Sequence, residues 1–291
     1  MAGLGNQMSQ YAAGRQAAIR NKTDLKLDLS WYDDPGPDTK REYLLKYFNI
    51  SAQIASEAEI KKLKGIRGSF WEKVVATRFP SLLKVGRSYL LENTTGAYDR
   101  KFLEVRDNTY LEGWWQCEKY FKEIGETIRK ELTIKTKPNA ANAKMLKEIG
   151  GSVSVSLHIR RGDYVSNKNY TKFHGVCGLD YYRRAVSYLS KRVKSPVFFV
   201  FSDDPEWVKK NLKLKYPTVC VAHNLGKNDY EDIRLMSNCR HNIVANSSFS
   251  WWGAWLNPNP QKIIIAPKRW YADPGVKKKD REIVPKSWIR L

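Results

Sequence analysis

The feature that most constrains the fold is a regular alternation of strand and helix patterns between residues 152 and 266. Residues 152–160 alternate apolar and polar side chains, which is the period of a strand. Residues 197–201 form an unbroken apolar run, which is typical of a strand covered on both faces. Further short strands are predicted at 219–222, 242–245 and 263–266. Because helical patterns separate these strands, the sequence predicts a doubly wound α/β sheet with parallel strands.

The helices of this half are predicted from apolar spacing and from capping residues. They are expected at about 180–193, 205–212, 229–239 and 249–256. The second of them begins with Asp204 as its cap and Pro205 in its first turn. The spacing therefore places one helix in each connection between successive strands.

The first half of the chain is less regular. It contains a predicted loop entering a helix at 5–20, a weak strand at 25–29, a helix at 54–64, and loops at 33–38 and 91–98. The polar, proline-containing segment 137–143 is the predicted linker. We therefore expect an N-terminal domain over 1–143, a C-terminal domain over 144–270 and a tail over 271–291.

The chain carries a large positive charge. Its 291 residues include 51 Lys and Arg against 30 Asp and Glu, a formal net charge of +21. This surplus favours an anionic partner, such as nucleic acid, a membrane surface or a phosphorylated substrate, and a generally basic surface is an equal alternative. The cations are scattered apart from a run at 277–279. No aromatic-interleaved basic motif accompanies them, so we expect no nucleic-acid partner.

Common signatures of metal, cofactor and membrane proteins are absent from the sequence. The four cysteines lie far apart without a C-x-x-C pair, which excludes the usual zinc spacings and a disulfide-rich scaffold. There is no Asp-x-Asp pair, no P-loop and no complete dinucleotide-binding glycine motif. The apolar runs are shorter than the ~20 residues that span a bilayer. We expect a cytoplasmic protein with reduced thiols that needs no metal and no cofactor.

Polar residues gather where the predicted strands end, which is where open α/β sheets bind ligands. His158, Arg160, Arg161 and Asp163 follow the first strand of this half. An Arg side chain matches phosphate oxygens well. The alternative is an internal salt bridge between an Arg and Asp163.

Two further strand ends carry polar clusters. After the apolar strand come Ser202, Asp203 and Asp204, of which one carboxylate is expected to cap the helix and the other to accept hydrogen bonds from a ribose or a base. After the fourth strand, residues 246–250 begin a helix with small polar side chains. Such a start can form an anion site, and an ordinary N-cap is the alternative.

The cluster at 158–164, His-Ile-Arg-Arg-Gly-Asp-Tyr, resembles the HxRRGDY signature of the α-1,2-fucosyltransferases, glycosyltransferase family 11. Residues 3–11 resemble the family's GLGNQMFQYA start, with Ser9 in place of the usual Phe, and 111–121 resemble its EGYWQSEKYF segment. Residues 201–205 and 246–255 match its two C-terminal blocks. Five blocks in the right order span nearly the whole chain.

This resemblance implies an α/β fold of the GT-B type, in which two Rossmann-like domains face each other across a cleft. It implies an inverting, metal-independent transfer of L-fucose from GDP-β-L-fucose to the 2-hydroxyl of a terminal β-galactoside. Alternatives are a fucosyltransferase of another linkage and a non-catalytic sugar- or nucleotide-binding protein. Family members carry an apolar strand before GLGNQ and almost nothing precedes Gly3 here, so we expect the N-terminal sheet to lack its first strand.

The resemblance also implies roles for individual residues. Arg160 is expected to bind the β-phosphate, and Asp163 or Asn6 to serve the attacking hydroxyl, with Asp163 alternatively orienting an Arg. The predicted donor-binding residues are His158, Arg160, Arg161, Ser202, Asp203, Asp204, Asn246, Ser247, Ser248 and Phe249. The predicted acceptor-binding residues are Gln7, Trp114, Trp115 and Tyr164, and core packing is an equal alternative for the two tryptophans. The expected partners are GDP-fucose, a β-galactoside and, through the basic charge, an anionic membrane surface at the inner membrane face.

Overall fold

The computed structural model describes residues 2–34, 40–65, 88–93, 96–226, 228–276 and 282–291. The chain forms two compact units: an N-terminal unit of residues 1–46 and 50–132, and a C-terminal unit of residues 47–49 and 133–291. The predicted boundary at 143/144 is replaced by one after Leu132, because residues 140–150 form a helix of the C-terminal unit rather than a linker. The predicted loop at 33–38 and the basic run at 277–279 lie largely or wholly outside the described residues.

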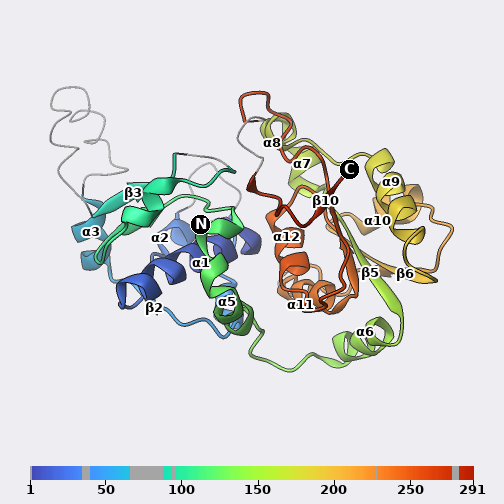
Figure 1. Ribbon diagram of the computed structural model, residues 1–291, viewed down its shortest axis with the longest axis horizontal. Coiled ribbons are helices and arrows are strands. Elements are labelled where there is room, and N and C mark those ends of the chain that lie inside the picture. The colour runs from blue at the N-terminus through green and yellow to red at the C-terminus, as the bar shows by residue number, and fades with distance from the viewer. Residues whose placement is uncertain (1, 35–39, 66–87, 94–95, 227, 277–281) are drawn as a thin grey trace. The chain divides into compact units, whose positions relative to one another are not determined.

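The C-terminal unit is built on a six-stranded parallel sheet (Figure 1). Its strands are β5 (Val153–Ile159), β6 (Pro196–Ser202), β7 (Thr218–Val221), β8 (His241–Ile243), β9 (Ile264–Ala266) and β10 (Ile289–Arg290). The spatial order is β10-β9-β8-β5-β6-β7. The chain therefore winds outward from β5 in one direction and from β8 in the other, as in the doubly wound Rossmann sheet that the sequence predicts.

The predicted tail at 271–291 is wrong, because this segment contains β10, which pairs with β9 in the same sheet. Ile289 lies opposite Ile265, and Arg290 lies opposite Ala266. A strand of two residues is too short to show a periodic pattern, so the sequence gives no signal for it.

Helices cover both faces of this sheet (Figure 1). One face carries α9 (Leu179–Ser190) and α10 (Pro205–Asn211), and the other carries α11 (Tyr230–Asn238) and α12 (Ser248–Trp255). Two short helices, α7 (Gly162–Ser166) and α8 (Lys168–His174), follow β5, and α6 (Ala140–Gly150) contacts α11. Each predicted helix of this half is present within a few residues of its expected bounds.

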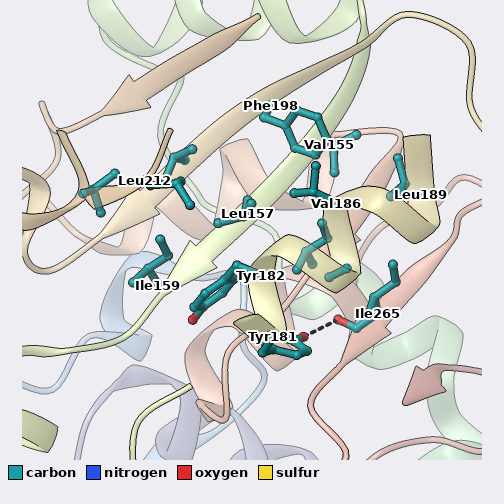
Figure 2. Packing of buried hydrophobic residues seen from close by; sticks show 14 residues of the cluster. Val155, Leu157, Ile159, Tyr181, Tyr182, Val186, Leu189, Phe198, Leu212 and Ile265 are labelled. Atoms are coloured by element: carbon teal, nitrogen blue, oxygen red, sulfur yellow. Dashed lines mark hydrogen bonds between the residues drawn. The ribbon is translucent and has the colours of Figure 1, made fainter. Parts of the chain in front are cut away.

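The period-two pattern of β5 separates two environments. Val155, Leu157 and Ile159 pack into the core beneath α9, together with Phe198 from β6 (Figure 2). Because successive side chains of a strand point to opposite faces, His158 lies on the other face, toward α12. The apolar core thus fixes which residues of β5 face the helix that follows β8.

The N-terminal unit is described in less continuous form. Its helices are α1 (Leu4–Asn21), α2 (Ser30–Asp33), α3 (Glu57–Lys64) and α5 (Gly125–Glu131), and its 3₁₀ turns lie at Leu45–Tyr47, Arg100–Glu104, Glu118–Tyr120 and Lys122–Ile124. Two parallel ladders join β1 (Lys26–Leu27) to β2 (Gln53–Ile54) and β3 (Tyr89–Leu91) to β4 (Tyr110–Glu112). Among the described helices, none is long and apolar enough to cross a membrane.

Candidate active site

The carboxyl ends of β5 and β8 are the point where the winding of the sheet reverses, and we call this point the switch. Since the chain leaves β5 and β8 toward opposite faces, a crevice is expected there. The structure brings two predicted clusters to it. The Tyr164 hydroxyl donates a 3.3 Å hydrogen bond to the Asn246 carbonyl, and the His158 and Phe249 rings lie 5.7 Å apart.

His158 is buried at the switch with a polar atom that nothing in the described structure satisfies. Its side chain is 5% exposed, and its Nδ1 has no hydrogen-bond partner among the described residues. Burial, and secondly the charge of Arg160, lower the pKa of His158 to about 3. The imidazole is therefore neutral, and its buried nitrogen is the type of group that a bound ligand satisfies.

Arg160 lies between two carboxylates. Its Nη2 is 2.6 Å from Asp163 Oδ1, and its Nη1 is 2.8 Å from Asp203 Oδ2. Burial alone would lower the pKa of Arg160, but the two carboxylates raise it above its ordinary value. The internal salt bridge considered as an alternative is thus present, and it fixes the direction of the guanidinium group.

Asp203 and Asp204 have different partners. Asp204 caps α10 by accepting from the Trp207 N–H at 3.1 Å, as predicted for one of the pair. The other carboxylate, Asp203, accepts from the Arg161 N–H at 2.8 Å and pairs with Arg160, and its predicted contact with a ribose or a base stays a prediction. A Cβ atom at Gly162 would lie 2.5 Å from Asp203 Oδ2, so a larger residue here would have to displace the Asp203 carboxylate.

The Arg161 side chain contacts residues at the start of α10 and does not point to the switch. Its guanidinium lies 3.9 Å from the centre of the Trp207 ring, and its Nε pairs with Asp204 at 3.1 Å. A charged group stacked and paired in this way is oriented by the helix. Its predicted contact with the donor stays a prediction.

Two predicted donor-binding side chains use their polar atoms within the protein. Asn246 Nδ2 donates to the carbonyls of His174, Gly175 and Trp270, at 3.0, 3.3 and 3.1 Å. Ser202 Oγ accepts from the Asp204 N–H at 3.0 Å. These bonds tie loops together, so both side chains shape the site rather than face it.

The start of α12 differs from an ordinary capped helix. Ser247 is the N-cap residue, yet its hydroxyl makes no capping bond, and Ser248 begins the helix. The first N–H groups of a helix have no partner within it, and the helix dipole adds positive potential there. The structure therefore keeps the arrangement that an anion requires at this end of α12.

Tyr164 packs between two groups of the same unit. The Arg160 guanidinium lies 5.4 Å from the centre of its ring, and the His174 ring stacks on it at 4.6 Å with an interplanar angle of 8°. Burial raises the pKa of the Tyr164 hydroxyl above its ordinary value. The stack supports Arg160 from one side, and the predicted acceptor contact of Tyr164 stays a prediction.

The two tryptophans of the N-terminal unit have different environments. Trp115 is 1% exposed and packs edge-on against Tyr120 at 5.1 Å, so the core-packing alternative holds for it. Trp114 is 38% exposed. Only Trp114 presents a ring that a sugar could stack on.

Glu92 holds the turn that exposes Trp114. It is not among the site residues predicted from the sequence. Its Oε2 accepts from the N–H groups of Trp114 and Trp115 at 2.7 and 2.9 Å. Trp115 has a φ of 52°, and a Cβ atom at Gly113 would lie 2.4 Å from Glu92 Cβ. Burial raises the pKa of Glu92. Glu92 lies in a stretch interpreted as a loop, where no periodic pattern marks it.

The GNQ segment contributes one structural and one accessible side chain. Gln7 is 2% exposed and its amide bonds the carbonyls of Ala2 and Glu42 and the N–H of Leu44, at 3.0, 2.8 and 2.9 Å. Its side chain is thus committed to the fold rather than to an acceptor. Asn6 is only partly buried, and its Oδ1 accepts from Gln116 Nε2 at 2.5 Å.

A second set of polar side chains that the sequence did not predict follows β7. Asp232, at the start of α11, accepts from Asn224 Nδ2 at 2.8 Å, and Asn224 exchanges hydrogen bonds with Asn142 at 2.9 Å. Burial, and secondarily nearby carboxylates such as Asp229, raise the pKa of Asp232 to about 7. In the sequence this residue is one of several acids at a helix start, and nothing there separates it from the others.

No group of three or more His, Cys, Asp or Glu side chains in the described ranges is placed to hold a metal ion. The four cysteines are all free thiols.

Comparison with known proteins identifies the same family as the sequence motifs. The profile of glycosyl transferase family 11 matches residues 89–291. An alpha-1,2-colitosyltransferase of Escherichia coli is 36% identical, covering 99% of this chain and 96% of that protein. The O-antigen biosynthesis glycosyltransferase WbnK of Escherichia coli is 33% identical, over 99% and 98%. The crystal structure of fucosyltransferase NodZ from Bradyrhizobium aligns with a TM-score of 0.51 at 14% identity, covering 86% of this chain and 88% of that one.

Proposed function

Because the chain belongs to glycosyl transferase family 11 and is therefore a glycosyltransferase with an α/β fold of the GT-B type, we propose that it transfers L-fucose from GDP-β-L-fucose to the 2-hydroxyl of a terminal β-galactoside. The transfer inverts the anomeric carbon and uses no metal. The observation that carries the proposal is the meeting, at the switch, of Arg160, the unsatisfied His158 nitrogen and the start of α12.

The chemical demand at this site is to stabilise the leaving diphosphate. As the bond between fucose and the β-phosphate breaks, negative charge grows on the phosphate while the sugar becomes oxocarbenium-like. Asp163 and Asp203 hold Arg160 in one orientation before the donor arrives, so little reorganisation is needed in the transition state. The N–H groups that begin α12 supply the second set of donors.

We assign the nucleoside to the carboxyl edge between the switch and β7. His158 offers its buried nitrogen to the donor. Asp232 is partly exposed, and its ionised carboxylate matches the N1–H and N2–H donors of guanine, so guanine binding should displace the proton that its raised pKa of about 7 retains. An Asp232→Asn variant should bind GDP more weakly and lose its preference for guanine over hypoxanthine. Unchanged affinities would remove this assignment.

The acceptor side of the proposal rests on Trp114 and Asn6. Trp114 offers an exposed ring, and Asn6 can orient a hydroxyl group through an amide that is too weak to act as a base. The 2.6 Å contact between Asp163 and Arg160 favours an orienting role for Asp163. A pH–rate profile that keeps its acidic limb in Asp163→Asn would support that role, whereas its loss would make Asp163 the base.

A second donor is favoured by one comparison. The 36% identical relative is named a colitosyltransferase, and colitose is L-fucose without its 3-hydroxyl group. Competition between GDP-fucose and GDP-colitose, with one acceptor, decides between the two sugars through the ratio of kcat/KM values.

The proposal is tested by an acceptor screen with GDP-fucose and a chelator in place of added metal. We expect GDP release that depends on a terminal β-galactoside and a product linked to its 2-hydroxyl. A product with another linkage, or a strict requirement for a divalent metal, would contradict the proposal. A His158→Ala variant should bind GDP weakly, and unchanged affinity would separate His158 from the donor.

A further inference from the structure

The two helical layers of the C-terminal unit differ sharply in charge. The α9–α10 layer, which we define as residues 179–194 and 205–215, carries nine exposed cations and two carboxylates. The cations are Arg183, Arg184, Lys191, Arg192, Lys194, Lys209, Lys210, Lys213 and Lys215. Both carboxylates are already paired, Asp180 with Arg183 at 3.2 Å and Glu206 with Lys209 at 2.7 Å. This one layer therefore holds about a third of the net charge of +21.

The opposite layer of the same unit is nearly balanced in charge. Counted in the same way, with the four residues after each helix, α6, α11 and α12 carry four cations and three carboxylates, which are Lys144, Lys147, Arg234, Arg240, Glu148, Glu231 and Asp232. A generally basic surface would charge both layers alike. Of the two layers, the α9–α10 layer therefore carries nearly all of the surplus positive charge.

The α9–α10 layer is separate from the switch. Its apolar residues pack on the sheet from the side of Val155 and Leu157, whereas His158 faces α12 on the other side. The cations therefore do not serve the donor. Apart from Arg183 and Lys209, which are paired with Asp180 and Glu206, the cations of this layer have no carboxylate within it, and exposed charges of one sign repel each other.

The surface of this layer offers an open groove along α9. Its volume is about 550 Å³, and four cations line it together with Tyr188, over which the Arg192 guanidinium stacks at 3.6 Å. A phosphate group can enter such a groove, and an aromatic ring beside it suits the boundary between water and lipid.

We infer that the α9–α10 layer binds the phosphate headgroups of an anionic lipid bilayer. The nine cations lie on α9, on α10 and in the four residues after each helix, and clusters of four to eight Lys or Arg on a helix are the pattern that anionic lipid attracts. The binding is peripheral and electrostatic, since among the described helices none can cross the membrane. It leaves the switch, at the carboxyl ends of β5 and β8, open to the donor.

The experiment measures binding to vesicles of phosphatidylcholine with about one-third phosphatidylglycerol, and to vesicles of phosphatidylcholine alone. The test variant carries Arg184→Gln, Lys191→Gln and Lys194→Gln. The control variant carries Lys137→Gln, Lys144→Gln and Lys147→Gln, which removes the same charge from the segment before α6 and from α6 itself. All six residues are exposed, and glutamine keeps the helical propensity at Arg184, Lys144 and Lys147, which lie within α9 and α6.

We expect the unaltered protein to bind only the anionic vesicles, and less well as salt is raised. The test variant should bind about a hundredfold more weakly, at roughly fivefold per cation, and the control variant only a few-fold more weakly. Both variants should keep the unaltered kcat and KM with a soluble acceptor, which separates this test from that of the proposed function.

Equal losses in the two variants would show that net charge alone drives binding and would overturn the inference. Absence of binding to anionic vesicles by the unaltered protein would overturn it as well. A third contradicting result is tight binding of a DNA duplex through the same three residues without binding of vesicles, because the partner would then be a nucleic acid.

Discussion

The two candidate sites of this protein, one in each unit, are held in place by opposite means. At the switch, a cation is oriented by carboxylates: Arg160 lies between Asp163 and Asp203. In the N-terminal unit, a buried carboxylate orients neutral groups, because Glu92 binds the backbone N–H groups that present Trp114. The first arrangement prepares a charge for a charged ligand, and the second prepares a surface for a neutral sugar. Substitutions at the two places should therefore affect different steps.

The largest effect is expected for Arg160→Ala. Removal of the guanidinium leaves Asp163 and Asp203 close together without their cation and takes away the main counter-charge of the leaving phosphate. We expect kcat/KM to fall about a thousandfold, and the melting temperature to fall without loss of the fold because the two carboxylates then repel each other. Arg160→Lys serves as the control, since it keeps a point charge and should recover part of the loss. Near-normal turnover in the Ala variant would show that Arg160 does not stabilise the leaving phosphate.

The two adjacent tryptophans should separate stability from acceptor binding. Trp115→Ala removes a fully buried ring and should lower the free energy of unfolding by about 3–5 kcal/mol. Trp114→Ala should leave the free energy of unfolding nearly unchanged and raise the acceptor KM about tenfold. Denaturant titration and acceptor kinetics measure both quantities. An unchanged acceptor KM in Trp114→Ala would show that the exposed ring has no part in the site.

Substitutions of Glu92 test the site of the N-terminal unit further. Glu92→Ala leaves two N–H groups of the turn without their acceptor, which should cost about 2 kcal/mol of folding free energy and raise the acceptor KM. Glu92→Gln keeps an acceptor oxygen and should do less. If both variants bind GDP with the affinity of the unaltered protein, the site of the N-terminal unit does not affect GDP binding at the switch. A loss of GDP affinity in Glu92→Ala would contradict that independence.

The last effect concerns stability alone and is a pH dependence that comes from Asp232. Its folded-state pKa of about 7 lies above the ordinary value for Asp, so the folded protein holds a proton that the unfolded chain releases. Stability from this group is therefore present at low pH and is lost as the pH rises from about 4 to about 7. Asp232→Asn should raise the melting temperature more at about pH 8 than at about pH 5. The same shift at both pH values would show that Asp232 is ionised throughout.

The sequence was sufficient for those parts of the fold that rest on repeated local patterns. The alternation in β5 and the apolar run of β6 predict the sheet, and Asp204 with Pro205 predicts the start of α10, because each signal lies within a few residues. The edge strand β10 and the boundary after Leu132 carry no such local signal.

Contacts between residues that lie far apart in the sequence could not be predicted from it. The contact between Asp203 and Arg160 joins residues 43 positions apart, and Glu92 meets Trp114 over 22 positions. Both depend on how strands and turns pack, so residue types alone leave them undetermined. The motif around Arg160 identified a phosphate ligand candidate, yet only the packing shows that two carboxylates already orient it.

The most direct test of the central claim, that Arg160 receives the diphosphate at the switch, is a comparison of GDP and guanosine affinity by calorimetry. In the unaltered protein, GDP should bind at least about a hundredfold more tightly than guanosine, because the phosphates meet charge-assisted donors. In Arg160→Ala this ratio should collapse toward one while guanosine affinity is retained. A ratio that stays the same in the variant would contradict the claim.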